Sequence, residues 1–393
     1  MAVNSMTKEQ AYSLIAALHN QATGNNTLAP TDLSSFISVA QATLAAGTEQ
    51  TLNAISQVLA KTLIAVRPYD EKFKGLEMTA EQWGGIIRKI NYADRGPESD
   101  AAYATVDGLS VDQYVVRKPH VLETRYVGSS VWSGSYTIFE NQLRTAFDSP
   151  DNFGSFMTGL MTHFLNERTQ WFESLKRSML ANAIAGVHDA GLTGSEIHLL
   201  TEYNTVTSIT PALDAQTVMQ PANFKPFMQW VYSRVSELSR LMSERSELFQ
   251  QIITGYPIYR HTPVNDQRIY MEASFLDQMD AMVLADTYHD NFLRYADVEG
   301  VSYWQAIDSP RDISVTPVYV DNTGAVNVAS GNVACSDVVG IMFDRDAIGY
   351  NVYNESLVAT PYNAKGSYYN LISHSDVQLQ NDLTEKIIVL YLD

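Results

Sequence analysis

One long stretch of the sequence decides the fold: residues 151–187 read DNFGSFMTGLMTHFLNERTQWFESLKRSMLANAIAGV. Its apolar residues recur three and four positions apart, which is the period of a helix with one buried stripe. At about 1.5 Å of rise per residue, this helix spans roughly 50 Å. The predicted stripe consists of Phe153, Phe156, Met157, Leu160, Met161, Phe164, Leu165, Trp171, Phe172, Leu175, Met179 and Ile184.

Residues that start and stop helices stand at both ends of this stretch. Asp151 or Asn152 is the predicted N-cap, because short polar side chains there accept the first free N–H groups. Gly186, Gly191 and Gly194 mark the end, since glycine readily adopts the left-handed conformation that closes a helix. Aromatic residues and interior glycines in the stripe argue against a coiled-coil seam. We therefore expect a beam along which several elements pack.

Composition indicates a large globular protein with an acidic surface. The chain has 393 residues, of which 45% are hydrophobic, and 26 basic against 44 acidic residues give a net charge of −18. An acidic surface repels phosphates, so sequence-specific binding of nucleic acid is not expected. The single cysteine, Cys335, excludes an internal disulfide. The polar N-terminus does not resemble a signal peptide, and no apolar run is long enough to span a membrane.

Before the long helix the sequence predicts a helical part followed by a part made of strands. Three short, Ala-rich helices are predicted from Thr7, from Asp32 and from Thr48, the last ending at Pro68 at the latest. Their weakly apolar stripes suit either a small helical domain or an arm that lies on another surface, and we consider them better suited to a neighbour than to a core. Strand-like runs follow at Gly84–Ile90, Gln113–Arg117, Leu122–Val127 and Val131–Phe139.

The last two of these runs are separated by Gly128, Ser129 and Ser130, a typical turn sequence. This pattern predicts a long hairpin or a three-stranded flap. Tyr126 and Trp132 contribute to its aromatic surface, and a flap of that kind packs on a partner. The alternative is an ordinary sheet inside the same domain.

After the long helix, helices and strands alternate irregularly. We predict helices at Asn223–Ile252 and from Phe275 to about His289. The terminal apolar run Ile387–Leu392 is typical of a strand buried on both faces. This order predicts an α+β fold. The remaining strands are expected at Arg268–Ala273, Val298–Ile307, Val315–Val320, Val326–Val328, Val338–Phe343 and Ile348–Tyr353.

No sequence motif assembles a catalytic, cofactor or metal site. His163 and Glu167 stand one helical turn apart, as metal ligands often do, but no third ligand follows. Asp286, His289 and Asp290 cluster at a helix end, where an ordinary surface role is the simpler reading. The segment Asp344–Asp346 could bind a hard cation, but its place between two strand-like runs favours a turn. Cys335 has no neighbouring pattern typical of a nucleophile.

Three C-terminal segments resemble tailed-bacteriophage major capsid proteins. They are Val339–Ala347 (VGIMFDRDA), Ala359–Gly366 (ATPYNAKG) and Asn381–Lys386 (NDLTEK) with its following strand. Earlier, Trp83–Ile90 resembles the segment leading into the flap of that family. The order of elements is also similar to the Hong Kong 97-type capsid fold over nearly the whole chain.

This resemblance implies a division of the chain and a function. Residues 1–94 would form an N-terminal helical arm and entry strand, 95–147 an extended β-loop, and 148–190 the spine helix of the peripheral domain. Residues 191–334 would form the axial domain, and 335–393 would complete the sheets. The implied function is that of the major head protein of a tailed double-stranded DNA phage, which self-assembles into an icosahedral shell of hexamers and pentamers.

The same resemblance implies partners and a location. Scaffolding and portal proteins would assist assembly in the host cytoplasm, and the shell of the virion would enclose DNA without reading its sequence. No membrane, cofactor or metal is expected. Candidate inter-subunit contacts are Arg117, Lys118, Arg125, Trp132 and Tyr136, with Asp277, Asp280 and Asp286 as acidic counterparts.

Two alternative functions remain open at this point. One is the shell of an encapsulin compartment, which resembles the same fold. The other, of a different class, is a soluble metal-dependent hydrolase that uses His163 and Glu167 or the cluster around Asp286.

Overall fold

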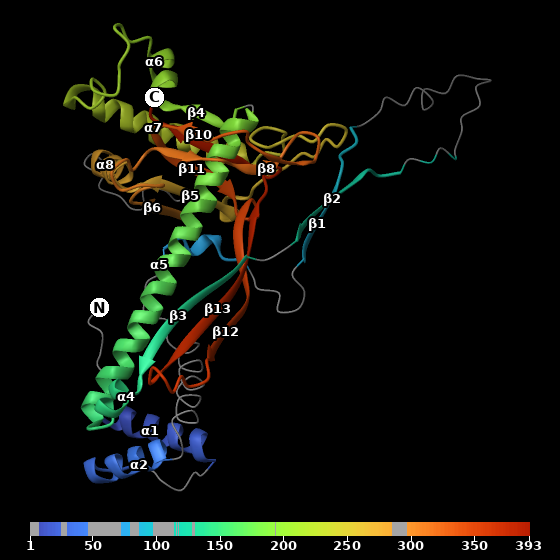
Figure 1. Ribbon diagram of the computed structural model, residues 1–393. Helices are drawn as coiled ribbons and strands as arrows, with labels where there is room; N and C mark the ends of the chain where they lie inside the picture. The colour runs from blue at the N-terminus through green and yellow to red at the C-terminus, as the bar shows by residue number, and fades with distance from the viewer. Residues whose placement is uncertain are drawn as a thin grey trace.

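The computed structural model describes residues 8–24, 30–45, 72–78, 86–96, 114, 116, 118–127, 130–192, 194–284 and 297–393. Helix α5 (Pro150–Ala190) runs along the whole body of the molecule, and sheets and helices are arranged on it from end to end (Figure 1). Its 41 residues confirm the predicted long helix. Apolar side chains from α5 enter two of the three buried clusters, so α5 is a beam as predicted.

The ends of α5 follow from its flanking residues, with one correction. The N-cap is Ser149 rather than Asp151 or Asn152: its side chain accepts a hydrogen bond from the backbone N–H of Asn152, 3.2 Å away. Pro150 at the first helical position explains the shift, because its fixed φ suits a helix start. At the other end Gly191 has φ 58°, the left-handed conformation expected of a closing glycine.

A five-stranded sheet lies beside the C-terminal half of α5 (Figure 1). The strand nearest the C-terminus of the chain has two buried faces. On one face Ile387, Val389 and Tyr391 belong to the cluster with α5, whereas Ile388 and Leu390 belong to the cluster on the opposite face. This alternation confirms a terminal strand buried on both faces. The strands in spatial order are β4 (Glu196–His198), β14 (Ile387–Tyr391), β11 (Val338–Asp344), β5 (Gln267–Glu272) and β6 (Asp297–Val301).

Three helices supply the apolar side chains on the far face of this sheet. They are α6 (Leu199–Thr207), α7 (Pro221–Ser243) and α8 (Ala273–Leu284). Helix α7 ends at Ser243, well before the predicted Ile252. The chain turns there, because the Met242 carbonyl accepts from the Thr262 N–H, and Phe249 has φ 69°, outside the helical region. The predicted helix end at His289 lies outside the described residues.

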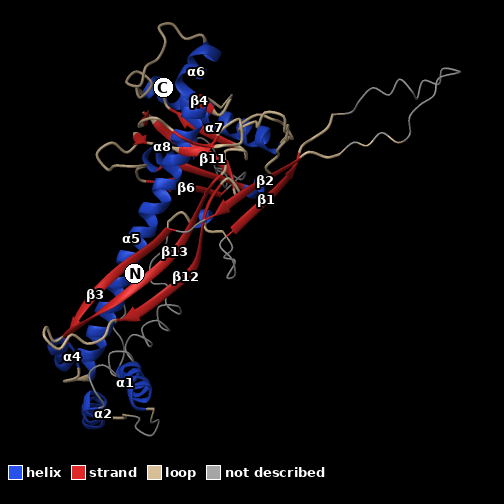
Figure 2. Ribbon diagram, turned by 45° about the vertical axis from the view of Figure 1, so that its right-hand side comes forward, coloured by secondary structure: helices blue, strands red, loops and turns tan. Residues whose placement is uncertain are grey.

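A second, three-stranded sheet lies along the N-terminal half of α5 (Figure 2). Its order is β12 (Ile348–Ala359), β13 (Tyr368–Asn381) and β3 (Ser130–Phe139). The predicted hairpin between the runs at 122–127 and 131–139 is therefore wrong. β3 pairs with β13, Phe139 facing Tyr368. The preceding strand β2 (Val121–Val127) pairs instead with β1 (Ile86–Tyr92).

The N-terminal helices α1 (Lys8–Thr23) and α2 (Leu33–Ala45) pack on the start of α5. Ile15, Leu18 and Phe36 are fully buried in one cluster with Phe153 and Met157 of α5. The expectation that these helices suit a neighbour better than a core is wrong for these two. The third predicted helix, 48–68, lies outside the described residues.

The remaining elements are short. Pro317 separates two strands where one was predicted, because proline cannot donate to a strand ladder. Of the run 113–117 the structure describes only Tyr114 and Val116, and neither lies in a strand. Arg345 and Asp346 lie in a turn directly after β11, as predicted, while Asp344 is the last residue of that strand. These elements are η1 (Lys74–Leu76), α4 (Glu140–Ala146), η3 (Val264–Asp266), β7 (Ile313–Val315), β8 (Val318–Val320), β9 (Val326–Val328) and β10 (Val333–Cys335).

Candidate assembly surface

Strands β1 and β2 form a two-stranded antiparallel ribbon that projects from the body (Figure 1). In an antiparallel pair, directly opposed residues share a face and successive residues alternate between faces. The ribbon therefore has one face with Lys89 and Asn91 and another with Arg88, Ile90 and Tyr92. The two faces have different surroundings.

The inner face of the ribbon is anchored to the body by buried polar contacts. Lys89 Nζ lies 2.8 Å from Asp382 Oδ2 and also contacts Glu385, and both carboxylates are buried. The Gln378 side chain donates to the backbone carbonyl of Tyr126 over 2.6 Å. These contacts hold the base of the ribbon to the strand β13 and the loop that follows it.

The outer face is exposed and combines apolar with charged side chains. Tyr92 and Val121 face one another across the ribbon and are 64% and 47% exposed, and Ile90 is 46% exposed. Arg88 and Arg125 are also direct cross-strand partners, an arrangement that repels unless a counter-charge intervenes. We call Arg88, Ile90, Tyr92, Val121, Glu123 and Arg125 the ribbon face.

Glu123 supplies that counter-charge. It accepts hydrogen bonds from the Arg125 and Arg88 guanidinium groups, and these bonds lower the pKa of Glu123 to about 2. The carboxylate is therefore charged at every physiological pH, and the trio carries one net positive charge. A basic surface with apolar neighbours is suited to an acidic, apolar partner surface.

The predicted contact residues are divided between two places. Arg125 lies on the ribbon face, and Lys118 is exposed just before β2, whereas Arg117 lies outside the described residues. Trp132 and Tyr136 are on β3, against α5. Sequence reasoning missed Ile90 and Tyr92, although their alternation with charged and polar residues in β1 is the signal of a two-faced strand.

Trp132 and Tyr136 line a groove of about 220 Å³ between β3 and α5. The ring of Trp132 lies 5.2 Å from that of Trp171, and the hydroxyl of Tyr136 donates to Glu167. Burial and the Glu167 carboxylate raise the pKa of Tyr136, so its hydroxyl stays protonated. Trp132 remains 46% exposed. We call the six residues of this surface the aromatic groove: Trp132, Tyr136, Phe164, Glu167, Arg168 and Trp171.

The other singled-out residues serve structural or surface roles. His163 and Glu167 are exposed and their side chains lie 3.4 Å apart on α5. Cys335 is buried, and burial raises the pKa of its thiol, which disfavours a thiolate nucleophile. Asp277 is exposed on α8, while the side chains of Asp280 and Asp286, with His289 and Asp290, lie outside the described residues.

The described residues also limit the classes of site. Within them, no group of three histidine, cysteine, aspartate or glutamate side chains is arranged to hold a metal ion. No helix in the described ranges is long and apolar enough to cross a membrane.

Comparison with known proteins identifies the family. The model of the Phi29-like phage major capsid protein family matches residues 15–391, nearly the whole chain. The chain belongs to this family. It is a capsid protein, a structural component of the shell of a tailed-phage head, and not an enzyme. The encapsulin and hydrolase alternatives are thereby set aside.

Solved structures confirm the predicted capsid fold of this protein. A chain from the capsid structure of Staphylococcus phage Andhra is 12% identical, with a TM-score of 0.54, and the match covers 82% of this chain and 84% of that one. A chain from the structure of head fiber and inner core protein gp22 of native bacteriophage P68 is also 12% identical, with a TM-score of 0.53 and coverages of 84% and 87%. No curated protein sequence matches the capsid protein.

Proposed function

We propose that this capsid protein forms a closed shell of hexamers and pentamers, assembled in the host cytoplasm with scaffolding and portal proteins, around double-stranded DNA. The net charge of −18 supports enclosure without sequence-specific binding, because an acidic wall does not trap DNA as it enters. The division of the chain at residues 94, 147, 190 and 334 into arm, loop, spine, axial domain and closing strands belongs to the same proposal.

The main support for a contact between subunits comes from the ribbon face. The described ribbon and its flanks, 86–96 and 118–127, hold five basic and two acidic side chains in a strongly acidic chain. Its apolar residues Ile90, Tyr92 and Val121 are exposed, although the chain beyond Tyr92 contacts the body again, where the Asp94 N–H donates to the Pro257 carbonyl over 2.7 Å. Such a surface is suited to a neighbouring copy rather than to solvent.

The aromatic groove is the proposed counterpart on the neighbour. Its Glu167 carboxylate is 55% exposed and offers a partner for Arg88 or Arg125, and the exposed ring of Trp132 offers a face for a guanidinium group. The predicted contact residues on the ribbon of one copy would then meet those in the aromatic groove of the next copy. Because the ribbon and the groove are different surfaces, this contact is heterologous and closes into rings when the rotation allows.

Sedimentation of the purified protein with negative-stain microscopy tests assembly. We expect fast-sedimenting closed or tubular shells of many copies, because modest contacts repeated around each subunit act together. Protein that sediments only as a monomer, with and without scaffolding protein and across salt and protein concentration, would contradict the proposal.

A further inference from the structure

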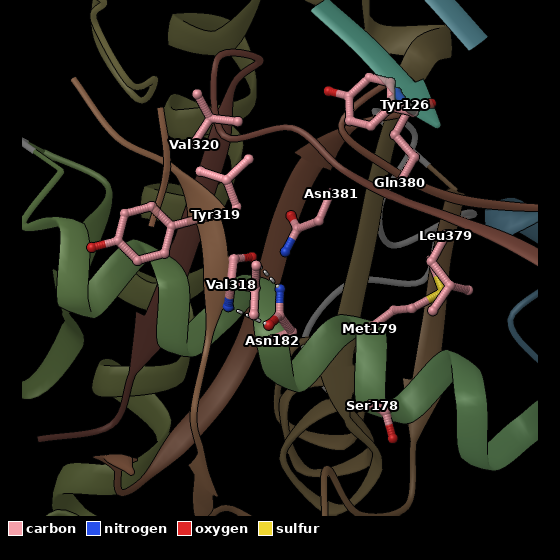
Figure 3. Close-up of a pocket in the computed structure, with 11 residues that line it drawn as sticks. Tyr126, Ser178, Met179, Asn182, Val318, Tyr319, Val320, Leu379, Gln380 and Asn381 are labelled. Atoms are coloured by element: carbon pink, nitrogen blue, oxygen red, sulfur yellow. Dashed lines mark hydrogen bonds between the residues drawn. The ribbon is translucent and has the colours of Figure 1, made fainter. Parts of the chain in front are cut away.

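A cavity of about 440 Å³ lies apart from the ribbon face and the aromatic groove (Figure 3). Helix α5, the hairpin of β8 and β9, the end of β13 and Tyr126 at the base of the ribbon contribute to its wall. Cavities that bind small molecules have this range of volumes, and they are mainly apolar with a few well-placed polar groups. The wall of this cavity therefore has to be read for the kind of molecule that it suits.

The wall is largely apolar, and none of the described residues that line it carries a charge. Val318 and Val320 of β8 share one face of the hairpin with Val326 of β9, because Val320 and Val326 are cross-strand partners. Met179 of α5 and Leu379 of β13 complete the apolar surface. An ion that enters such a site without a partner loses its hydration uncompensated. The cavity is therefore suited to a neutral molecule.

Two of the amide side chains in the wall are already engaged by the fold. Asn182 binds the main chain of Val318 with both amide atoms: its Nδ2 donates to the carbonyl over 3.0 Å, and its Oδ1 accepts from the N–H over 2.8 Å. The Nε2 of Gln380 donates to the Asp346 carbonyl over 2.9 Å. These bonds fix the wall.

Asn381 is the exception. Its Oδ1 and its Nδ2 are both buried, and neither has a hydrogen-bond partner in the described part of the chain. Figure 3 shows this side chain extending from β13 toward Val318 and Asn182. The Oε1 of Gln380 is likewise buried without a partner among the described residues. Unpaired buried polar groups are rare in folded proteins, and a ligand with matching groups would satisfy them.

The free groups of Asn381 specify the chemistry of that ligand. Its Nδ2 requires an acceptor, and the Oδ1 beside it requires a donor. A primary carboxamide presents a carbonyl oxygen and an N–H side by side, so it pairs with Asn381 through two parallel hydrogen bonds. A carboxylate has no donor for Oδ1, and an amidinium group has no acceptor for Nδ2. The apolar walls suit a planar ring attached to the carboxamide.

We propose that this cavity is a binding site for a neutral aromatic carboxamide, which pairs with Asn381 and places its ring between the hairpin valines and α5. The site goes beyond the proposed function and does not depend on it, because all of its residues belong to one subunit. A ligand in contact with α5, the hairpin and β13 stabilises the folded subunit, since it binds the native state only.

Thermal melting of the unassembled full-length subunit with benzamide, benzoate and benzamidine tests the site. The three probes have the same ring and nearly the same shape, and they differ in the group that faces Asn381. Benzamide is expected to raise the melting temperature progressively with its concentration, whereas benzoate and benzamidine should leave it unchanged. No rise with benzamide up to its solubility limit, or an equal rise with all three probes, would overturn the proposal.

The variant Asn381→Asp reverses the expected preference. Its carboxylate only accepts hydrogen bonds and is charged, so it forms a charge-assisted pair with the amidinium group of benzamidine. Calorimetric titration should show benzamide bound at least about tenfold more weakly than by the wild type, and benzamidine bound in its place. Asn332→Asp is the matched control, because Asn332 is exposed and does not line the cavity. It should bind benzamide like the wild type.

A second variant tests the cavity without changing a buried group. Val326 is 72% exposed at the open side of the cavity, so Val326→Trp fills that side and leaves the core intact. This variant should melt like the wild type and lose the response to benzamide, even if Asn381→Asp does not fold. Unchanged benzamide binding in either folded variant would contradict the site.

Discussion

At the residue scale, one largely buried cation, Lys89, contributes to the attachment of the ribbon. Burial disfavours the charge of Lys89, but Asp382 and Glu385 outweigh it and raise the pKa of Lys89. Burial likewise opposes ionisation of Asp382, yet Lys89 and a hydrogen bond from Thr384 hold the pKa of Asp382 below its ordinary value of 3.8. The Lys89 ammonium group thus offsets part of the negative charge of the Asp382 and Glu385 carboxylates. Arg260 adds a second cation, 3.1 Å from Glu385.

We predict that Lys89→Met lowers the free energy of unfolding of the unassembled subunit by about 3 kcal/mol at pH 7. Removing one partner of a buried ion pair usually costs about 3–5 kcal/mol, and Arg260 keeps the effect at the lower end. Denaturant unfolding measures this change. Lys118→Met, the same substitution at an exposed position near the ribbon, should change stability by no more than about 0.5 kcal/mol.

The pH dependence of the same variant is a separate prediction with a definite sign. A carboxylate with a lowered pKa stabilises the fold above its ordinary pKa, and this contribution is lost as the pH falls below it. The Asp382 contribution is therefore lost in the wild type below pH 3.8, whereas the variant has already lost it. Unfolding measured from pH 7 downward should show the gap between the two proteins narrowing. A gap that widens on acidification would show that Lys89 does not stabilise the Asp382 carboxylate.

At the element scale, α1 and α2 act as part of the subunit rather than as a detachable arm. The ring of Phe36 lies 5.9 Å from that of Tyr12 and 6.0 Å from that of Phe153, so α2 joins α1 to the start of α5. Inside the same pair of helices, His19 Nδ1 lies 3.0 Å from the hydroxyl of buried Thr43. The helices contribute both apolar packing and satisfied polar contacts.

We expect Phe36→Ala to lower the free energy of unfolding by about 3–5 kcal/mol, the usual loss for a fully buried phenylalanine. Leu33→Ala on the same helix is the control, because Leu33 is 51% exposed, and a change within about 0.5 kcal/mol is expected. Thermal or denaturant unfolding of the unassembled protein provides the comparison. Equal stability of the two variants would indicate that α1 and α2 do not belong to the subunit core.

Helices and strands with a local sequence pattern are predicted correctly, whereas the pairing of strands that are far apart in the sequence is not. The period of α5 and the alternation of β14 are visible over a few residues, so both were predicted. The partner of β3 is more than 200 residues away, whereas Gly128, Ser129 and Ser130 suggest a local turn, and the hairpin prediction was wrong. The predicted end of helix α7 is too late because Phe249 continues its period, whereas the helix ends at Ser243, where the Met242 carbonyl accepts a hydrogen bond from the distant Thr262 N–H.

The candidate site could be predicted only in part for the same reason. Arg125 and Trp132 were singled out from charge and aromatic content, which the sequence shows directly. Their separation onto the ribbon and the groove depends on strand pairing, which it does not show. Lys89 was missed because its acidic partners Asp382 and Glu385 lie almost 300 residues later.

At the scale of the whole molecule, the distribution of charge is the feature relevant to assembly. A chain of net charge −18 presents copies that repel one another. The basic ribbon offsets this repulsion at one surface, and an attractive contact repeated at every subunit boundary has an effect that a single surface pair does not have. Attraction between exposed charges weakens with salt, with a screening length of about 10 Å at 0.1 M and 3 Å at 1 M.

We therefore predict that Arg88→Glu with Arg125→Glu leaves the melting of the unassembled subunit nearly unchanged and lowers the yield of shells roughly tenfold at low salt. Both side chains are more than half exposed, so the fold does not depend on them, and reversal places three acidic groups on the ribbon face. The wild-type yield should fall as salt rises, while the variant yield should not.

Lys365→Glu with Arg345→Glu makes the same change in net charge at exposed positions outside the ribbon and should retain the wild-type salt dependence. Sedimentation across a salt series measures all three proteins, and normal shells from the ribbon variant at both low and high salt would exclude a charge-dependent ribbon contact.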